Sequence, residues 1–264
     1  MFSIDNNDTY FTRAGKTLLR QSLEKIISVI PKDGSVKSMA VAGGCFRSYF
    51  FKEKYTDLDI FLLSDRNTAR EFITKTRYNL VKEYPKIDFG GIAEVTLKLP
   101  VNFSGTIGTK RIEKKFLRFN IPPLPNRNTF PLQLIQYSHN VDGEEIWPEC
   151  GRELISLFDI IPTCFAAEVV YNNDTTYVFN GVSAHPLLLE SLVNKELLPN
   201  TQYGRVINPV MALERFYKYT SVYGFKVSSK EHMTLFCNLM GIPDSMQISY
   251  NIEGDSIACE ESMF

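Results

Sequence analysis

The sequence predicts an α+β fold, in which a mixed sheet flanked by helices is followed by a small helical part. The first observation is a series of short apolar runs of strand-like composition up to about residue 182, separated by loops with glycine or proline. The second is the helical spacing of leucine and isoleucine over residues 9–30. The third is the helical character of the sequence that follows. We therefore expect a main domain over 1–182 and a small helical region over 183–264.

The first third of the chain is expected to alternate helices and strands. The helix over 9–30 is expected to end at the proline and glycine that follow it. The apolar run 38–42 predicts a short buried strand that ends at two glycines, and residues 45–51 predict a short helix. The apolar run 57–63 predicts the next strand. A helix over 65–81 follows, since an aspartate at its first position suits the N-cap.

The middle of the chain reads as strands. Residues 94–99, 116–121 and 132–137 are the candidate strands, separated by loops that carry glycine or proline. Residues 144–158 are expected to hold a helix that is interrupted near a proline and a glycine. Residues 159–180 then predict a strand, an Asn-Asn-Asp turn and a short partner strand.

Three helices are expected after residue 183. They cover residues 184–197, 208–225 and 229–241. The middle one has the clearest limits, because Asn208 and Pro209 suit the N-cap and first helical positions. Gly224 suits its end.

The composition is that of an ordinary globular protein. Hydrophobic residues make up 44% of the chain and charged residues 22%. No apolar run reaches the about 18 residues of a transmembrane helix, and the N-terminus lacks the basic and apolar regions of a signal peptide. The five cysteines show no CxxC spacing, which argues against a zinc site or a disulfide scaffold. We therefore expect a cytoplasmic protein with no membrane partner. Its net charge of −1 means that any contact with nucleic acid needs a local basic patch.

Two aspartates lie in a run that otherwise reads as a buried strand. In a strand, Asp57, Asp59 and Phe61 share one face, while Leu58 and Ile60 share the other. The two carboxylates are then roughly 6–7 Å apart at the Cα level, close enough to bind one cation. Their repulsion and desolvation would be costly unless a positive charge lies beside them. Carboxylate oxygens suit Mg²⁺ or Mn²⁺, so the pair predicts a divalent metal site.

The preceding glycines and arginine extend this prediction to a nucleotide. Gly43 and Gly44 remove side chains where a strand ends and a helix begins, so backbone N–H groups there can approach phosphate oxygens. Arg47 lies one turn into that helix and is placed to contact a phosphate. Each feature alone is common in structural turns. Together with the metal-binding pair, they predict a site for a nucleoside triphosphate.

These residues form a signature that resembles a known family. The stretch AVAGGCFRSYFFKEKYTDLDIFLL, residues 40–63, is similar to the head-domain signature of the class II CCA-adding enzymes and bacterial poly(A) polymerases, within the polymerase-β-like nucleotidyltransferase superfamily. The matching positions are Gly43, Gly44, Phe46, Arg47, Asp57 and Asp59. Ser48 stands where the family usually has an aspartate.

Two later segments resemble the same family in the same order. Residues 157–171 are similar to its Arg-Arg-Asp-Phe-Thr motif, which reads the incoming ribose; Asp159 is kept, whereas Leu157 and Phe158 replace the arginines. Residues 208–227 resemble the segment that begins the family's neck. The matching positions there are Pro209, Arg215, Phe216, Gly224 and Phe225, while Met211 and Glu214 depart from the arginines often seen.

The resemblance implies a two-metal mechanism of nucleotidyl transfer. Asp57 and Asp59 would hold two Mg²⁺ ions, one activating an attacking hydroxyl and the other stabilising the leaving pyrophosphate. Asp159 is the candidate third carboxylate: the superfamily makes it a metal ligand, the class II motif makes it a ribose contact, and a structural role at a strand edge or cap is the remaining reading. Glu94 and Asp88 rank below it. The candidate catalytic and metal residues are Asp57, Asp59 and Asp159, and the candidate nucleotide contacts are Gly43, Gly44, Arg47 and Arg215.

The expected function is therefore Mg²⁺-dependent transfer of a nucleoside monophosphate from an NTP, such as ATP, to an acceptor hydroxyl. The resemblance favours an RNA or tRNA 3′ end as acceptor. Transfer to a protein or small molecule is an alternative, and so is a catalytically idle fold that serves as a binding or structural protein. The chain ends near where the family's body and tail domains would begin. This leads us to expect a compact single-head member, of a kind associated with phage genomes, that would act in the host cytoplasm.

A basic segment in the middle of the chain is a candidate nucleic-acid contact. Residues 108–119 carry five basic residues against one glutamate. The basic residues are Lys110, Arg111, Lys114, Lys115 and Arg118. They could bind the backbone of RNA, with the neighbouring phenylalanines available for stacking. A solvated hairpin is the alternative interpretation.

Overall fold

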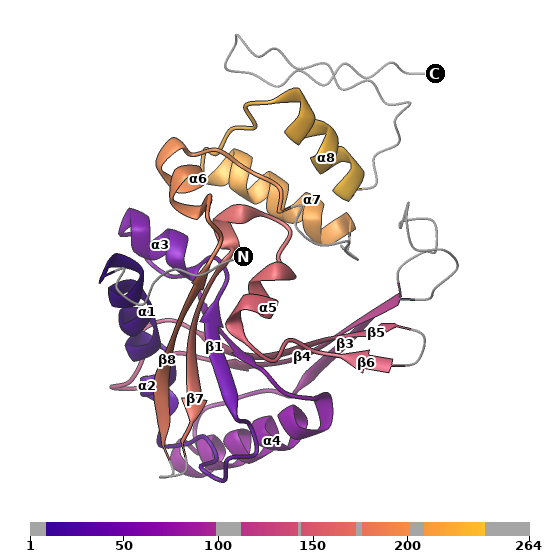
Figure 1. Cartoon of the computed structure of the whole chain (residues 1–264). Helices are drawn as coiled ribbons and strands as arrows, with labels where there is room; N and C mark the ends of the chain where they lie inside the picture. Colours follow the sequence, from indigo (N-terminus) through magenta and orange to yellow (C-terminus); the bar gives the residue numbers. More distant parts are fainter. Residues whose placement is uncertain (1–8, 99–111, 142–143, 173–175, 201–208, 241–264) are drawn as a thin grey trace.

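The computed structural model describes residues 9–98, 112–141, 144–172, 176–200 and 209–240. Within these ranges the chain forms one mixed sheet of eight strands with helices packed against it (Figure 1). The strand order is β3–β4–β5–β2–β1–β7–β8, and β6 pairs with β5. All pairs are antiparallel except β2 and β5, which run parallel. The predicted α+β fold class is therefore confirmed.

The bounds of the elements follow the chain. The strands are β1 (Ser38–Ala42), β2 (Leu58–Leu62), β3 (Ala93–Lys98), β4 (Ile112–Ile121), β5 (Leu132–Val141), β6 (Glu144–Ile146), β7 (Phe165–Tyr171) and β8 (Tyr177–Ala184). The α-helices are α1 (Thr9–Gln21), α2 (Leu23–Ile26), α3 (Cys45–Phe51), α4 (Arg66–Glu83), α5 (Gly151–Ser156), α6 (Leu188–Asn194), α7 (Pro209–Tyr217) and α8 (Lys230–Met240). A 3₁₀ turn, η2, covers Ile161–Thr163, and a π-helical segment, η3, covers Lys218–Val222.

Alternation along the central strands gives the sheet two packed faces. Val41 and Ile60 are paired across β1 and β2 and belong to the main core, where α1 and α4 pack. Ala42 and Phe61 point to the opposite face and form a smaller core with Leu154 of α5. Figure 1 shows α3, α6, α7 and α8 at one end of the sheet and α4 at the other. Asp59 pairs with Ala42, the last residue of β1, and α3 begins three residues later. Asp59 therefore lies at the end of the sheet where α3 and the C-terminal helices gather.

The helix predicted over 9–30 was wrong in its length. The structure ends α1 at Gln21 and leaves only a short second helix, α2. The buried Ser22 hydroxyl donates to the Leu18 carbonyl at 2.7 Å, and the Ser22 amide donates to the same oxygen at 3.0 Å. A serine hydroxyl that shares a backbone acceptor in this way bends or interrupts a helix.

The other predicted elements differ mainly at their ends. The Asp65 cap is confirmed, because its carboxylate accepts from the Thr68 amide at 3.0 Å. β4 and β5 are longer than predicted, because Ile112 and Val141 pair with each other beyond the apolar runs. The interrupted helix predicted over 144–158 was wrong in its first part, because residues 144–146 pair with β5 as β6 and only α5 is helical. β8 continues to Ala184, and the division of the chain into two domains stays a prediction.

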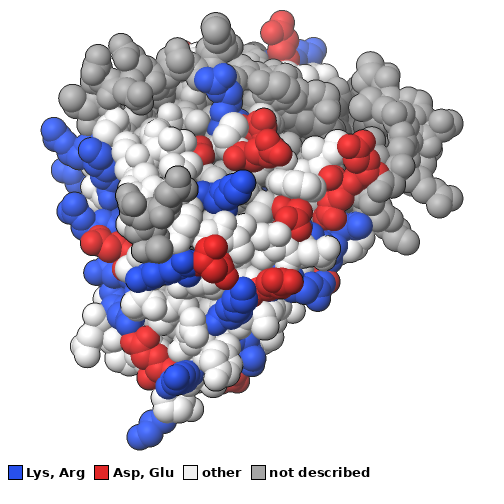
Figure 2. Space-filling model, turned by 60° about the horizontal axis from the view of Figure 1, so that its bottom comes forward, with Lys and Arg blue, Asp and Glu red and all other residues white. Residues whose placement is uncertain are grey.

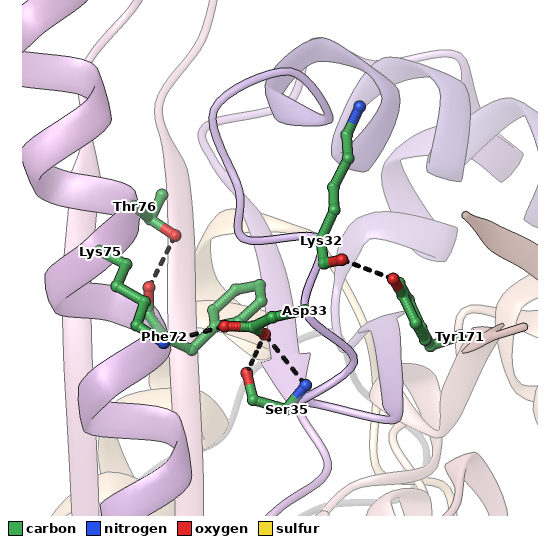
Figure 3. A network of polar contacts seen from close by, with 7 residues as sticks. All are labelled: Lys32, Asp33, Ser35, Phe72, Lys75, Thr76 and Tyr171. Carbon is green, nitrogen blue, oxygen red and sulfur yellow. Dashed lines mark hydrogen bonds and ion pairs between the residues drawn. The ribbon is translucent and has the colours of Figure 1, made fainter. Parts of the chain in front are cut away.

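A polar network fixes the loop that leads into β1, at the far end of that strand from its glycines (Figure 3). Asp33 accepts from Lys75 of α4 at 2.9 Å and from the amide and hydroxyl of Ser35. The Tyr171 hydroxyl of β7 donates to the Lys32 carbonyl at 2.5 Å. The hydrogen bonds from Lys75 and Ser35 hold the pKa of Asp33 well below its usual range. The loop is thus tied to both a helix and a neighbouring strand.

The outer surface near α4 carries charges of both signs. Figure 2 shows lysine, arginine, aspartate and glutamate side chains interspersed on the face that includes the lower end of Figure 1. Among the described residues on this face, basic side chains are interspersed with acidic ones. Across the described ranges, no helix combines the length and apolar character that crossing a bilayer requires.

Candidate active site

A pocket of about 210 Å³ opens where β1 ends and β2 begins. Two of its lining residues are acidic, Asp57 and Asp59, and we call them the acidic wall. Three are cationic, Arg47, Arg215 and Lys218, and we call them the basic wall. The other lining residues are Ala42, Gly44, Cys45, Ser48, Thr56, Thr163, Tyr219 and Tyr223. The fold thus brings three segments that are distant in the sequence to one cavity.

The acidic wall is built by the register of the central strands. Asp59 pairs with Ala42 across β1 and β2, and it pairs with Gln133 across β2 and β5. The Gln133 amide donates to the Asp57 carboxylate at 3.0 Å, and the Thr56 hydroxyl donates to the same side chain at 3.1 Å. Both aspartates line the pocket, as their period-2 spacing predicted.

The electrostatics of the acidic wall favour a bound cation. Burial, followed by the charge of Asp57, raises the pKa of Asp59 from 3.8 to about 7. The cations Arg215, Arg118 and Lys218 oppose this rise without cancelling it. The positive charges of the protein therefore do not fully offset the cost of burying the Asp59 carboxylate beside Asp57. Two carboxylates in this state are a donor set that fits Mg²⁺ or Mn²⁺.

A glycine turn lies beside the acidic wall, and its backbone conformation requires glycine at one position. Gly43 has a φ of +88°, a region that side chains with a Cβ rarely adopt, and a Cβ there would lie 3.8 Å from the Asp59 Oδ2 atom. A Cβ on Gly44 would lie 3.5 Å from the Tyr219 hydroxyl. The Gly43 amide donates to the Phe165 carbonyl at 3.2 Å. The sequence predicted Gly43 and Gly44 as phosphate contacts. Because the Gly43 amide already donates a hydrogen bond to Phe165, its contact with a phosphate stays a prediction.

Arg47 lies in the basic wall but is already engaged. Its side chain is only 5% exposed and forms an ion pair with Glu53 at 2.7 Å. It also donates to the Ser48 hydroxyl at 3.1 Å, and its guanidinium lies 3.5 Å from the centre of the Tyr223 ring. Ser48, which replaces the family's aspartate, thus serves as an acceptor for Arg47. The predicted phosphate contact of Arg47 stays a prediction.

Asp159 and Arg215 form an ion pair between the loop after α5 and α7. The Arg215 Nη1 donates to Asp159 Oδ2 at 2.6 Å. The Asp159 side chain is 3% exposed, and its Oδ1 has no hydrogen-bond partner among the described residues. Asn200 holds the backbone of this loop, since its amide donates to the Asp159 carbonyl and its side chain donates to Phe158. Burial lowers the pKa of Arg215, but the charge of Asp159 outweighs it, so the pKa lies above its ordinary value.

The third carboxylate predicted from the sequence stays a prediction. Within the described ranges, no group of three His, Cys, Asp or Glu side chains is placed to hold one metal ion. Asp159 contacts Arg215 and does not line the pocket. Glu94 forms ion pairs with Arg66 and Arg70, and Asp88 accepts from the amide of Gly90. The Asp159 side chain reaches the pocket only through Arg215.

The sequence interpretation missed part of the basic wall. Lys218, Tyr219 and Tyr223 lie in or beside η3, the π-helical segment that follows α7. Their segment, 208–227, was recognised as neck-like, but no spacing rule singles out a π turn. Such turns are rare and occur often at functional sites.

The predicted basic patch does not form one surface in its described part. Lys110 and Arg111 lie outside the described residues, and so does the side chain of Lys114. Lys115 and Arg118 belong to β4, where three positions apart means opposite faces. Arg118 pairs with Ile135 of β5, and Ile135 pairs with Phe61 of β2. Because Phe61 and Asp59 are two positions apart in one strand, Arg118 lies on the same face of the sheet as Asp59.

Neither protein-family models nor curated proteins match this sequence, but solved structures do. The Thermotoga maritima CCA-adding enzyme complexed with tRNA matches over 86% of this chain and 44% of that chain, with 13% identity and a TM-score of 0.48. A CCA-adding enzyme with CTP matches over 84% and 44%, with 13% identity and a TM-score of 0.45. A tRNA nucleotidyltransferase with a primer tRNA and an incoming ATP analog matches over 78% and 47%, with 15% identity and a TM-score of 0.39. The chain thus spans less than half the length of these structures, and the likeness concerns the fold alone.

Proposed function

We propose that this protein is a Mg²⁺-dependent nucleotidyltransferase, which moves a nucleoside monophosphate from an NTP to an acceptor hydroxyl. The observation that carries the proposal is the pocket itself, where Asp57 and Asp59 share one cavity with the cations Arg47, Arg215 and Lys218. An NTP complexed with a divalent cation has the complementary charges: the cation suits the acidic wall, and the phosphates suit the basic wall.

We assign separate roles in the reaction to the residues in and beside the pocket. Asp57 and Asp59 would hold the divalent cation, and Gln133 would orient Asp57 through the 3.0 Å hydrogen bond. Bound there, the cation would neutralise charge on the phosphoryl oxygens and lower the pKa of the attacking hydroxyl. Gly44 lines the pocket without a side chain, and the positive φ of Gly43 allows the chain to turn there. The rate enhancement would come from positioning and charge, as in phosphoryl transfer generally.

The expected acceptor is the 3′ hydroxyl of an RNA, with tRNA as the first candidate. The motif resemblance favours this acceptor. In addition, Arg118 is exposed on the same face of the sheet as Asp59 and could contact the RNA backbone. A protein or small-molecule acceptor is the second candidate, because the described part of the predicted basic segment does not form one basic surface.

Each labelled NTP, incubated with the purified protein, Mg²⁺ and a cell lysate, tests the proposal. Label on RNA is the expected result, and a variant with both Asp57→Asn and Asp59→Asn should give none. Label on protein or on small molecules would move the function to the second candidate. Absence of label on any acceptor would contradict transferase activity and favour an idle fold that serves in binding.

Charge reversal at Arg118 is expected to weaken RNA binding, whereas reversal at Lys115 is not. The two residues are on the same strand but on opposite faces, which makes Lys115→Glu a matched control. Loss of one phosphate contact should reduce the slope of log affinity against log salt by about 1. Gel shifts with a single-stranded RNA at several salt concentrations, without Mg²⁺, measure this slope. Equal slopes for the two variants would remove Arg118 as a contact.

A further inference from the structure

The three cations of the basic wall differ in how far their charges are neutralised. Arg47 is paired with Glu53 at 2.7 Å, and Arg215 is paired with Asp159 at 2.6 Å. Lys218 forms no ion pair with any residue in the described part of the chain. Its side chain is exposed and yet lines the pocket. Lys218 is therefore the cation of this wall whose charge is available to a ligand.

The π-helical segment sets the position of Lys218. The Tyr223 amide donates to the Lys218 carbonyl at 3.2 Å, which closes the wide turn. The Lys218 Nζ lies 5.6 Å from the centre of the Tyr223 ring, and the same ring lies against the guanidinium of Arg47. Tyr223 thus links the paired Arg47 to the unpaired Lys218. Arg47 acts here as a positioning residue, because its side chain is buried, is held by Glu53 and contacts Tyr223 in the segment that carries Lys218.

The proposed reaction requires such a charge in the same pocket as the acidic wall. The acceptor oxygen forms a bond to the α-phosphorus, and the bond from that phosphorus to the α–β bridging oxygen breaks. The bridging oxygen keeps the electron pair and leaves with pyrophosphate, while the hydroxyl proton passes to solvent. Negative charge therefore grows on the leaving group, which Asp57 and Asp59 would repel. An unpaired ammonium offsets this charge as a compact point charge with three donors.

We propose that Lys218 binds the β- and γ-phosphates of the NTP and stabilises the departing pyrophosphate. This inference rests on the proposed function and assigns the leaving-group subsite within it. It predicts that the pocket distinguishes triphosphates from monophosphates through Lys218, and that inorganic pyrophosphate competes with the NTP at the same residue.

Lys218→Ala is the direct test, with Lys230→Ala as the control. Lys230 is an exposed lysine of α8 outside the pocket. In Lys218→Ala, the KM for NTP and the inhibition constant of pyrophosphate should both rise about 10- to 100-fold, the loss expected for one hydrogen bond to a charged group. The KM for the acceptor should stay unchanged, and Lys218→Arg should restore most of the binding. An effect on the acceptor KM alone would overturn the assignment, as would an unchanged inhibition by pyrophosphate.

Binding of pyrophosphate separates this inference from the proposed function. Calorimetry of the full chain with Mg²⁺ and inorganic pyrophosphate requires no turnover. If the wild type transfers no nucleotide but binds pyrophosphate, and Lys218→Ala does not bind it, the subsite stands and the transferase proposal fails. If the wild type transfers nucleotide and both proteins bind pyrophosphate equally, the transferase proposal stands and the subsite fails. If the wild type does not bind pyrophosphate, the subsite is wrong.

Discussion

Replacing Asp59 with asparagine is expected to abolish Mg²⁺-dependent nucleotidyl transfer and, without divalent cations, to stabilise the fold. The activity should fall by about 10³-fold or more, because metal-assisted charge stabilisation in such sites is worth several kcal/mol. The fold should persist, since Asp59 lies at the pocket and asparagine has nearly the same shape. A single-turnover assay with labelled NTP measures the loss. Glu231→Gln, on α8 outside the pocket, controls for the loss of one negative charge.

The stability effect follows from the raised pKa of Asp59. The folded protein holds this proton up to about pH 7, whereas the unfolded chain releases it near 3.8. Between these values the folded state binds more protons, so this group makes the free energy of unfolding decrease as the pH rises from about 4 to 7. The Asp59→Asn variant would lack this dependence, because an amide does not titrate in this range.

Thermal unfolding in EDTA at several pH values measures the difference between Asp59→Asn and wild type. The variant should gain stability over wild type as the pH rises through this window, with each kcal/mol worth about 2–4 °C in Tm. Addition of Mg²⁺ should raise the Tm of wild type more at pH 8 than at pH 6, because the cation competes with the proton, and should leave the variant nearly unchanged. Full activity in Asp59→Asn, or an equal Mg²⁺ response in both proteins, would contradict the metal site.

The acidic wall could be predicted from the sequence because its geometry is local. Asp57 and Asp59 are two positions apart in one strand, so the period of a strand alone places them on one face. Gly43 and Gly44 lie between β1 and α3, as the sequence predicted, and Gly43 has a positive φ that was not predicted. The same local reasoning predicted the Asp65 cap, which lies within one turn of its partner.

Arg47 and Arg215 of the basic wall were candidates from the sequence, but Lys218 and the ion pairs of the two arginines were not, because these features depend on tertiary packing and backbone conformation. The pairing of Asp159 with Arg215 is set by how α7 packs over the loop after α5, and no spacing rule reports that contact. The position of Lys218 depends on a π turn, which lacks a composition signal. The case of Arg47 differs, because Glu53 is close in sequence, yet only the αL conformation of Lys52 at the end of α3 brings the two together.

Of the two substitutions that break the Asp159–Arg215 ion pair, Arg215→Ala is expected to lower the free energy of unfolding more. Asp159 is 2% exposed, and in Arg215→Ala its carboxylate would be buried with neither oxygen accepting a hydrogen bond from a described side chain. Breaking a buried pair in this way costs about 3–5 kcal/mol; we expect about 3 kcal/mol, because the Arg215 side chain is 39% exposed. Asp159→Asn should cost less, because Arg215 can still reach water.

A double-mutant cycle isolates the pair. The double variant Arg215→Ala, Asp159→Asn should be more stable than Arg215→Ala alone, because it no longer buries an uncompensated charge. Urea unfolding of the four proteins at pH 8 measures the coupling, which should be about 1–3 kcal/mol for groups in contact. Additive effects, or a smaller loss in Arg215→Ala than in Asp159→Asn, would contradict a buried ion pair. The same pair joins α7 to the loop after α5, and η3, which carries the lysine proposed to receive the pyrophosphate, directly follows α7.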